Sequence, residues 1–490
     1  MLKINLELCL LGLRASGMIK EYDYKVLTRV FEPKSIAIIG ASPKPGKIGN
    51  MVLRNIVQSG YKGSIYPVNP RHDKIMGFKS YKSILDINDE VDLCIISIPA
   101  PKVPDVLLEC GKHRVAGAVI FASGFSEHSE EGRYLEYKLL EIARTYGIRV
   151  IGPNCMGFFN AEINLNATFS PGITADLIRK GRSGYAAFIS QSGALSTAIL
   201  LEAASQGIFF NMFFTLGNKV DVDESDLLVY LSRKDGIRVV GIYLEGFSEG
   251  RGRVFIELSR KVGRRKPIVV VKTGKTIAGS RAVRSHTGSL AGDYILYRAM
   301  FKQANIIEAN SLRELLSFTK LTRVKYPLNG DRVMIISGSG GAAVLATDAL
   351  EANGVKVEAL PQEVINELRS ILNVPPYASI NNPLDLTFEG MTKENFVRSI
   401  EYLSMKGIAD VFLVCLIGSR ALEVADALVE IIDEVRKPII VTWTGKVSKE
   451  IKEKASFLDE NGIPVFDFPD EAASLLGRYI NYLKRSRFRR

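Results

Sequence analysis

The sequence predicts an α/β protein built from three doubly wound units in series, and three observations support this fold class. Short apolar runs recur along the chain, and segments with helical periodicity separate them. Breaker-rich segments at Gly152-Pro153-Asn154 and at 325–330 divide the runs into three groups. The 490 residues suffice for two to four domains. Because alternating strands and helices produce parallel sheets covered on both faces, each group is expected to form one doubly wound unit.

The domain boundaries follow from these breaks. We expect an N-terminal extension over residues 1–25, with Met18 as an alternative native start, and domains over 26–151, 152–326 and 327–490. The strands expected in the first domain are 34–40, 64–69, 92–99, 117–122 and 149–152. Those of the second are 184–190, 211–216, 239–244, 268–272 and 304–308, and those of the third are 332–337, 356–360, 410–416, 438–443 and 464–466.

Composition narrows the class of protein. A hydrophobic content of 47% with 24% charged residues is typical of soluble globular proteins, and no apolar run approaches the roughly 18 residues of a membrane span. The five cysteines are scattered without paired spacing, which favours a reducing cytoplasm and no structural metal. The net charge of +11 is largely dispersed, so nucleic acid is disfavoured, whereas nucleotides or phosphate esters suit the positive field.

A glycine loop follows the first expected strand. The segment from Gly40 to Gly49 opens a helix, where backbone amides and the helix dipole favour a phosphate. It matches neither a dinucleotide loop nor a nucleoside triphosphate loop, and a plain tight turn is the alternative. The second strand ends in Asn69 followed by Pro70 and Arg71, without the carboxylate that binds an NAD ribose. This ending suits an adenosine with an extra phosphate.

Two further turns between strand and helix are rich in serine and glycine. They span 189–195 and 336–342, and each is a candidate anion site at a helix start. Together they suggest a phosphate held between two helix ends. Neither turn contains Gly-x-Ser-x-Gly, which disfavours a serine hydrolase.

His286 is one of only four histidines, and small residues surround it in 285–292. The stretch from Thr273 to Asp293 is expected to be a long loop leaving the carboxyl end of strand 268–272, and such loops are usually functional or disordered. Glu245 ends the preceding strand, so its carboxylate would hold one imidazole nitrogen while the other attacks phosphorus. The alternatives are a surface histidine on a mobile loop and an exposed glutamate.

Together these motifs resemble the NDP-forming acyl-CoA synthetases, the superfamily that contains succinyl-CoA synthetase, and in particular the α subunits of its ADP-forming acetate–CoA ligase branch. The resemblance covers nearly the whole chain from about Val26. Its elements, in order, are Gly40-Ala41-Ser42, Ile98-Pro99-Ala100-Pro101, Ile151-Gly152-Pro153-Asn154-Cys155-Met156-Gly157, Ser190-Gln191-Ser192-Gly193, Tyr243-Leu244-Glu245-Gly246, Ser285-His286-Thr287-Gly288 and Asn382-Pro383-Leu384-Asp385.

The resemblance implies a Rossmann-like CoA-binding domain followed by two flavodoxin-like domains of the succinyl-CoA synthetase type. It implies conversion of acyl-CoA, ADP and phosphate into a carboxylic acid, CoA and ATP, through an acyl phosphate and a phosphohistidine at His286 that Glu245 orients or stabilises. Coenzyme A is then a substrate, and Mg-bound ADP or ATP is expected on a separate ATP-grasp β chain within an α2β2 assembly. The acid remains open among acetate, branched, aryl and dicarboxylic acids, as does ADP against GDP.

The resemblance also assigns site residues. The expected CoA-binding residues are Gly40, Ser42, Lys44, Lys47, Asn69, Pro99, Ser123 and Gly124. The expected phosphate-binding residues are Asn154, Ser190, Ser192, Gly193, Gly338, Gly340 and Gly341. No metal ligand is assigned. The alternative functions are a CoA-binding regulatory module without turnover and an NAD-dependent oxidoreductase.

Overall fold

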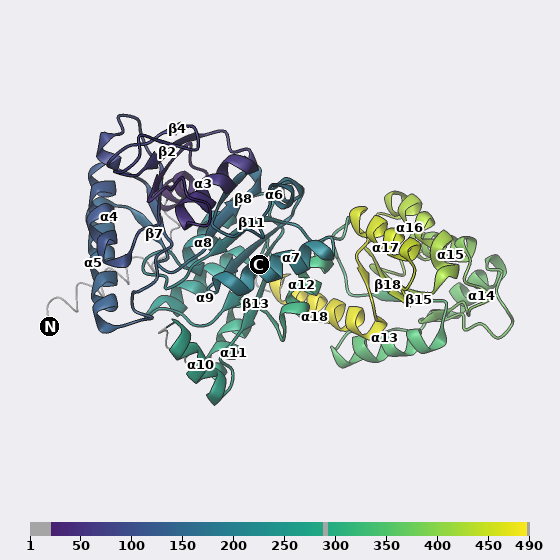
Figure 1. Ribbon diagram of the computed structural model, residues 1–490. Helices are drawn as coiled ribbons and strands as arrows, with labels where there is room; N and C mark the ends of the chain where they lie inside the picture. The colour runs from purple at the N-terminus through teal and green to yellow at the C-terminus, as the bar shows by residue number, and fades with distance from the viewer. Residues whose placement is uncertain (1–20, 288–292, 488–490) are drawn as a thin grey trace. The chain divides into compact units, whose positions relative to one another are not determined.

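The computed structural model describes residues 21–287 and 293–487, which form two compact units that divide after Leu315 (Figure 1). The first unit holds two large sheets and the second holds one, and helices pack against all three. The expected α/β fold class is therefore confirmed. None of the helices in the described ranges is both long and apolar enough to cross a membrane.

The first sheet is parallel throughout, with the strand order β2-β1-β5-β6-β7. All five strands predicted for this domain are present: β1 (Ser35–Ile39), β2 (Ser64–Val68), β5 (Leu93–Ile96), β6 (Gly117–Ile120) and β7 (Arg149–Ile151). Its helices are α2 (Glu21–Phe31), α3 (Ile48–Ser59), α4 (Val103–Lys112) and α5 (Glu130–Tyr146). Smaller elements are β3 (Lys74–Ile75), β4 (Phe78–Lys79), η1 (Ile84–Asp86) and η2 (Ala100–Lys102). Residues 21–25, assigned above to an extension, form the first turns of α2.

Alternate residues of β1 face different cores, as the two-residue period of a strand requires. Ile36 and Ile38 pack in the cluster that contains α2 and α3 side chains, whereas Ala37 and Ile39 pack with α4 and α5. Helices therefore cover both faces of this sheet, which explains why its strands are short apolar runs without alternation.

The second sheet has the order β14-β13-β12-β10-β11-β8-β9. Its strands are β8 (Gly157–Asn160), β9 (Leu165–Thr168), β10 (Ala186–Ser190), β11 (Phe210–Thr215), β12 (Val239–Leu244), β13 (Ile268–Lys272) and β14 (Ile307–Ala309). Its helices are α6 (Ala175–Gly181), α7 (Gly193–Ser205), α8 (Glu224–Ser232), α9 (Arg251–Val262), α10 (Ile277–Thr287) and α11 (Tyr294–Ala304), with η3 (Ala161–Ile163). The chain then continues through α12 (Leu312–Leu321).

The second sheet is not parallel throughout, because β8 and β9, which were not predicted, add an antiparallel hairpin at its edge. Polar residues make the turn between them. The Asn160 side chain caps η3, and Asn164 adopts a left-handed conformation with φ of +54°. Asparagine tolerates that region, so no glycine marks the turn in the sequence. The strand predicted at 304–308 begins later, at Ile307.

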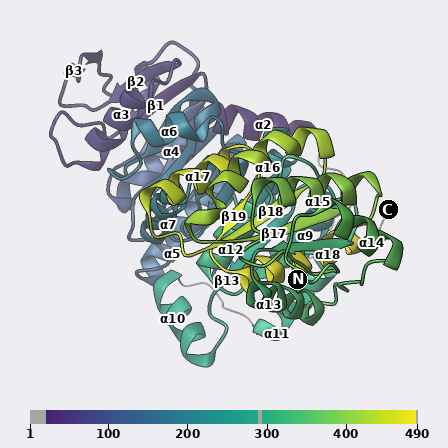
Figure 2. The same ribbon diagram turned by 90° about the vertical axis from the view of Figure 1, so that its right-hand side faces the viewer.

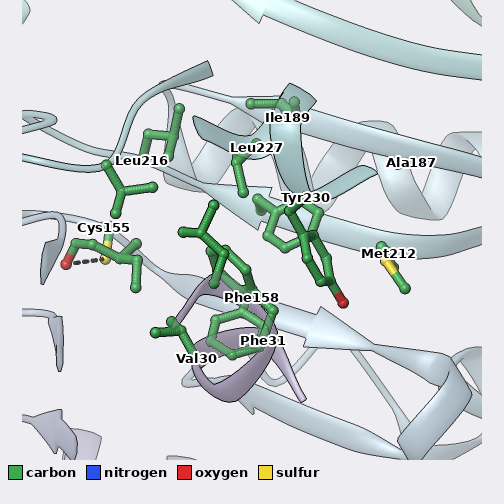
Figure 3. Close-up of a cluster of buried hydrophobic side chains, with 14 of the residues drawn as sticks. Val30, Phe31, Cys155, Phe158, Ala187, Ile189, Met212, Leu216, Leu227 and Tyr230 are labelled. Atoms are coloured by element: carbon green, nitrogen blue, oxygen red, sulfur yellow. Dashed lines mark hydrogen bonds between the residues drawn. The ribbon is translucent and has the colours of Figure 1, made fainter. Parts of the chain in front are cut away.

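Helix α2 contributes to a core shared by the two sheets of the first unit (Figure 3). The Phe31 ring lies 5.2 Å from that of Phe158 on β8 and 5.0 Å from that of Phe214 on β11, both edge to face. Tyr230 of α8 packs against the same ring at 5.0 Å. The two sheets are thus fixed relative to each other, so that sites at their edges keep a defined spacing.

A cluster of ion pairs also joins the two sheets of the first unit. Arg149 on β7 binds Asp221 at 2.8 Å and Asp226 at 2.9 Å, and Arg251 binds Asp226 at 2.8 Å. Burial raises the pKa of Asp226, but the charges of Arg149 and Arg251 outweigh this and hold it at about 2. Since this is below the ordinary value of 3.8, the folded carboxylate binds protons more weakly than the unfolded one. Its stabilising contribution is complete above about pH 4 and is lost as pH falls toward 2.

We expect Arg149→Met to lower the free energy of unfolding by about 3 kcal/mol, because it leaves largely buried carboxylates without their cation. Urea unfolding followed by circular dichroism at pH 7 measures this. The control is Arg179→Met, which removes an exposed pair with Asp176 and should change stability by less than about 1 kcal/mol. Equal effects of both variants would contradict a structural role for the Arg149 cluster.

The second unit contains a parallel sheet with the order β16-β15-β17-β18-β19. Helices α13 and α18 lie together on one face, and α15, α16 and α17 cover the other (Figures 1 and 2). The strands are β15 (Val333–Ser337), β16 (Leu384–Asp385), β17 (Val411–Ile417), β18 (Ile439–Thr444) and β19 (Val465–Phe466). The helices are α13 (Gly340–Ala352), α14 (Gln362–Ile371), α15 (Lys393–Met405), α16 (Leu422–Val435), α17 (Lys449–Glu460) and α18 (Pro469–Arg487), with η4 (Ser419–Ala421).

The strand predicted at Lys356–Leu360 was wrong. Two of its backbone N–H groups bond to side chains: Val357 donates to Glu351 Oε1 and Leu360 donates to Asn381 Oδ1. The position beside β15 is taken instead by β16, which comes later in the chain.

The long loop predicted after β13 was also wrong, because residues 277–287 form α10. Thr276 begins this helix, and its Oγ1 accepts a hydrogen bond from Gly279 N at 3.0 Å. This cap, with alanine and arginine residues at 278, 281, 282 and 284, offsets the poor helix propensity of Gly279 and Ser280. His286 therefore lies near the end of a helix, and the expected loop residues 288–292 lie outside the described residues.

Candidate functional site

All three glycine or serine loops lie where the strand order of a sheet reverses. The chain leaves β1 for β2 on one side and later returns to β5 on the other side of β1. The same reversal occurs around β10, between β11 and β12, and around β15, between β16 and β17. A crevice forms at such a point, outside the carboxyl ends of the strands, and open α/β sheets bind ligands there. The loops after β1, β10 and β15 are therefore the three candidate ligand sites.

The loop after β1 touches the ends of both neighbouring strands. Gly40 has φ of +85°, and a Cβ added to it would lie 2.6 Å from the carbonyl oxygen of Ser97, after β5. From the other side, Asn69 Nδ2 donates to the carbonyl of Ala41 at 2.8 Å. The structure thus brings Gly40 and Asn69 together. Ser97 belongs to the same corner but was not predicted, because its contact depends on the strand order.

Gly49 ends the predicted loop but was not among the expected CoA-binding residues. A Cβ added to it would lie 2.0 Å from the carbonyl oxygen of Gly40, so α3 packs directly on the loop. Lys47 precedes α3 without a side-chain hydrogen bond that caps the helix, so no cap covers its first amides. Lys44 and Lys47 are exposed, and Lys44 N donates to Ser42 Oγ at 3.2 Å. These features suit a polyanion.

The remaining expected CoA residues lie along the same edge of the sheet. Pro99 precedes η2, after β5, and Ser123 and Gly124 follow β6. A Cβ added to Gly124 would lie 3.5 Å from that of Ala100, so these two segments are neighbours. Gly124 N donates to Glu127 Oε1 at 2.7 Å, which fixes the turn.

The segment 152–157 connects the first crevice with the second. Asn154 has φ of +57°, and its N–H donates to the carbonyl of Ala122 at 2.9 Å, at the edge of the first sheet. Two residues later, Met156 lies against the start of α7, where a Cβ added to Gly193 would be 2.6 Å from its Cγ. The candidate CoA and phosphate residues are therefore neighbours within the first unit.

The turns after β10 and β15 have the same local geometry. Ser190 Oγ donates to the carbonyl of Ser192 at 2.9 Å and accepts from Ser192 N at 3.2 Å. Ser337 and Ser339 repeat both bonds, at 2.7 and 3.0 Å. Neither α7 nor α13 has a side-chain cap on its first turn. Both helix starts thus leave amides that would suit an anion.

The start of α13 differs in one respect. The carboxylate of Asp385 lies 2.9 Å from the position of a Cβ on Gly340, and Met391 lies against Gly338. Negative charge is already present beside this helix start, whereas the nonpolar Met156 lies beside the start of α7. The α7 site is accordingly better suited to an additional anion.

Glu245 follows β12 and is only 3% exposed, which excludes the alternative of an exposed loop residue. Its main chain is held by buried side chains from two neighbouring strands. Gln191 Oε1 accepts hydrogen bonds from the N–H groups of Glu245 and Gly246, and Lys272 Nζ donates to the carbonyl of Glu245 at 2.7 Å. Lys219, in the loop after β11, donates from Nζ to the carbonyl of Gly246 at 2.7 Å. Sequence reasoning missed all three of these side chains.

Burial perturbs the ionisable groups around Glu245. It lowers the pKa of Lys272 to about 8, although the negative charge of Glu245 acts in the opposite direction. Burial also raises the pKa of Tyr243, and a hydrogen bond with Glu245 adds to that increase. The Glu245 carboxylate is therefore in a desolvated setting, where its charge acts strongly on a neighbouring cation.

His286 is the penultimate residue of α10, which follows β13, the strand paired with β12. Glu308 of β14 binds one residue before α10 and one residue at the start of α11. Lys275 Nζ lies 3.0 Å from its carboxylate, and the Tyr294 hydroxyl donates to the same group. The helix starts beside these contacts expose three aliphatic side chains: Ile277 at 85%, Ile295 at 71% and Leu296 at 68%.

Three family models match consecutive parts of the chain. Residues 34–161 match a CoA binding domain, residues 183–322 match a succinyl-CoA ligase like flavodoxin domain, and residues 333–486 match a Ligase-CoA domain. Each of the three sheets described above lies largely within one of these ranges, although β8 and β9 of the second sheet lie outside the range of the flavodoxin model.

Several proteins resemble almost the entire chain. The acetate–CoA ligase (ADP-forming) II subunit alpha of Pyrococcus furiosus is 39% identical over 92% of this chain and 96% of its own length. The acetate–CoA ligase (ADP-forming) I of Archaeoglobus fulgidus is 40% identical over 92% of this chain, which spans only 64% of that protein. The dinucleotide forming acetyl-coenzyme A synthetase 1 of Candidatus Korarchaeum cryptofilum, solved with phosphate and ADP, superimposes with a TM-score of 0.85 at 37% identity, covering 94% of this chain and 97% of its own.

Proposed function

The chain belongs to the family of ADP-forming acetate–CoA ligases, and from this premise we propose that it is the catalytic α subunit of an ADP-forming acyl-CoA synthetase whose expected substrate is acetyl-CoA. One observation carries the proposal. A buried carboxylate, Glu245, lies at the strand-order reversal beside the uncapped start of α7, directly after the strand that pairs with the one leading to His286. This arrangement suits phosphoryl transfer through a histidine.

The proposed reaction has three steps. An oxygen of inorganic phosphate attacks the thioester carbonyl of acyl-CoA, and the C–S bond breaks to release CoA, which takes up a proton. An imidazole nitrogen of His286 then attacks phosphorus, and the bond between phosphorus and the acyl oxygen breaks to release the carboxylate. The phosphohistidine finally transfers its phosphoryl group to an oxygen of ADP. Phosphoryl transfer depends mainly on positioning and charge stabilisation, which helix amides and a fixed carboxylate supply.

The CoA site is proposed at the first crevice. Gly40, Ser42, Lys44, Lys47 and Asn69 would hold the phosphate-bearing nucleotide part, with Pro99, Ser123 and Gly124 along the adjoining edge. The uncapped start of α3, the two exposed lysines and an amide instead of a carboxylate after β2 support this assignment. The relatives do not favour an NAD-dependent oxidoreductase.

We expect Gly49→Ala to weaken CoA binding by roughly 10²-fold, because the new methyl group would lie 2.0 Å from the Gly40 carbonyl and displace the loop. Calorimetric titration of CoA measures the change. Gly236→Ala is the matched control, since the nearest atom to its added methyl group is 3.7 Å away. Unchanged CoA affinity in folded Gly49→Ala protein would exclude this loop as the CoA site.

The phosphate-binding residues are proposed in two parts, one in each unit. The first part is the start of α7, with Ser190, Ser192 and Gly193 and with Asn154 nearby, and the second is Gly338, Gly340 and Gly341 at the start of α13. Met156 supports the position of the first part, because its segment joins the CoA edge to α7. An acyl phosphate formed from acyl-CoA would then arise next to the thioester that it comes from.

We further propose that the nucleotide site, with Mg-bound ADP or ATP, lies on an ATP-grasp β chain in an α2β2 assembly. The supporting fact is that the relatives from Pyrococcus furiosus are named as alpha subunits, a name that implies a partner subunit. The exposed Ile277, Ile295 and Leu296 suit contact with such a partner close to the histidine segment.

The test is to purify the chain with its copurifying partner and to measure ATP formed from acyl-CoA, ADP and phosphate. A panel of acetyl, branched, aryl and dicarboxylic acyl-CoA thioesters identifies the acid, and acetyl-CoA is expected to be the best. ATP formation that requires all three substrates supports the proposal. CoA binding without turnover of any thioester would instead indicate the regulatory module.

A further inference from the structure

We infer that Gln191 is a positioning residue for phosphoryl transfer: its side-chain carbonyl fastens the Glu245 turn to the start of α7. The inference rests on the proposed function, in which Glu245 serves His286 and α7 binds phosphate. Gln191 lies between the two serines of the α7 turn, and its side chain crosses from β10 to the end of β12. The two halves of the proposed site would thus keep one relative position.

The hydrogen bonds of Gln191 define which end of its amide is used. Its Oε1 accepts from the N–H groups of both Glu245 and Gly246, the latter at 2.9 Å. Two main-chain donors require an acceptor opposite them, so the carbonyl must face the turn. The Gln191 main chain adds a third link, since its N–H donates to the carbonyl of Tyr243 at 3.4 Å.

The nitrogen end of the Gln191 amide is not used in this contact. Gln191 is 3% exposed, and its Nε2 has no hydrogen-bond partner among the described residues. A buried donor without a partner is unfavourable, so an apolar side chain of similar size would remove this cost. It would also leave two buried N–H groups without an acceptor. The hydrogen bonds that the Gln191 side-chain carbonyl accepts are therefore the ones whose loss is costly.

The other side chains that bind the main chain of this turn come from other parts of the fold. Lys272 and Lys219 bind the carbonyls of Glu245 and Gly246, but they come from the end of β13 and from the loop after β11. With Gln191, they give every main-chain polar group of the Glu245-Gly246 pair a buried side-chain partner. Loss of the Gln191 side chain would leave the turn bound by Lys272 and Lys219 but without its side-chain hydrogen bonds to the start of α7.

The test compares two substitutions in the complex with the partner chain. Gln191→Met keeps the size of the side chain but cannot accept a hydrogen bond, and it should slow phosphorylation of His286 about 10-fold or more while leaving the KM for CoA unchanged. The matched control is Gln206→Met at the exposed far end of α7, which should behave as the wild type.

The outcomes separate this inference from the function on which it rests. Absence of label on His286 in the wild type would refute the proposed function. Normal labelling of the wild type together with an equally fast Gln191→Met variant would overturn only the positioning role. A parallel loss of CoA affinity and phosphorylation in Gln191→Met would also overturn it.

Discussion

Replacing His286 with alanine is expected to abolish ATP formation, with a fall in kcat of roughly 10⁴-fold or more, because no other group would carry the phosphoryl group between the two substrates. The earlier step does not use the imidazole. His286→Ala protein should therefore still release CoA from acyl-CoA in a phosphate-dependent single turnover. Rapid-quench measurement of CoA and ATP in the reconstituted complex separates the two steps.

His128→Ala is the control for this experiment. His128 is exposed in the turn after β6 and has no role in the proposed transfer, so the variant should keep wild-type turnover. If His286→Ala formed ATP at a rate near that of the wild type, the phosphoryl group would have to pass directly to ADP or through another residue.

Replacing Glu245 with glutamine is expected to lower the rate of phosphoryl transfer about 10²-fold. The substitution preserves the shape of the side chain, and the contacts with Gln191 and Lys272 are made by the main chain of residue 245, so they remain. What is lost is a buried negative charge. That charge favours the imidazole tautomer that attacks phosphorus and stabilises the positive charge that develops on the ring.

The matched control is Glu249→Gln, which removes an exposed carboxylate four residues farther along. It should leave kcat unchanged, and both variants should bind CoA normally. A Glu245→Gln variant with wild-type phosphorylation kinetics would show that the carboxylate does not act on His286.

Strands were the part of the fold that could be predicted best. The strand from Val239 to Leu244 is an uninterrupted apolar run because helices cover both faces of its sheet. Such runs are recognisable in the sequence as buried strands. Lys356–Leu360 was misjudged because strand formation needs a neighbour, and β16 holds the position beside β15. Residues 277–287 were misjudged because glycine and serine indicate a loop, whereas the Thr276 cap and the alanines and arginines stabilise a helix.

The candidate site was predictable as a set of motifs but not as an arrangement. Glu245 and the 190–193 turn could be identified because each follows a buried strand. Their contact through Gln191 could not, since β10 and β12 are separated by β11 in the chain and are adjacent only in the sheet. Lys272 carried a signal that was overlooked: a lysine that ends a fully buried apolar strand needs a specific partner.

The most direct test of the account is to incubate the complex of this chain and its partner with Mg²⁺ and ATP labelled at the γ-phosphate. The account predicts label on this chain that is acid-labile and base-stable and that maps to His286, with discharge on addition of ADP. An unlabelled wild-type chain, or equal labelling of His286→Ala, would contradict it.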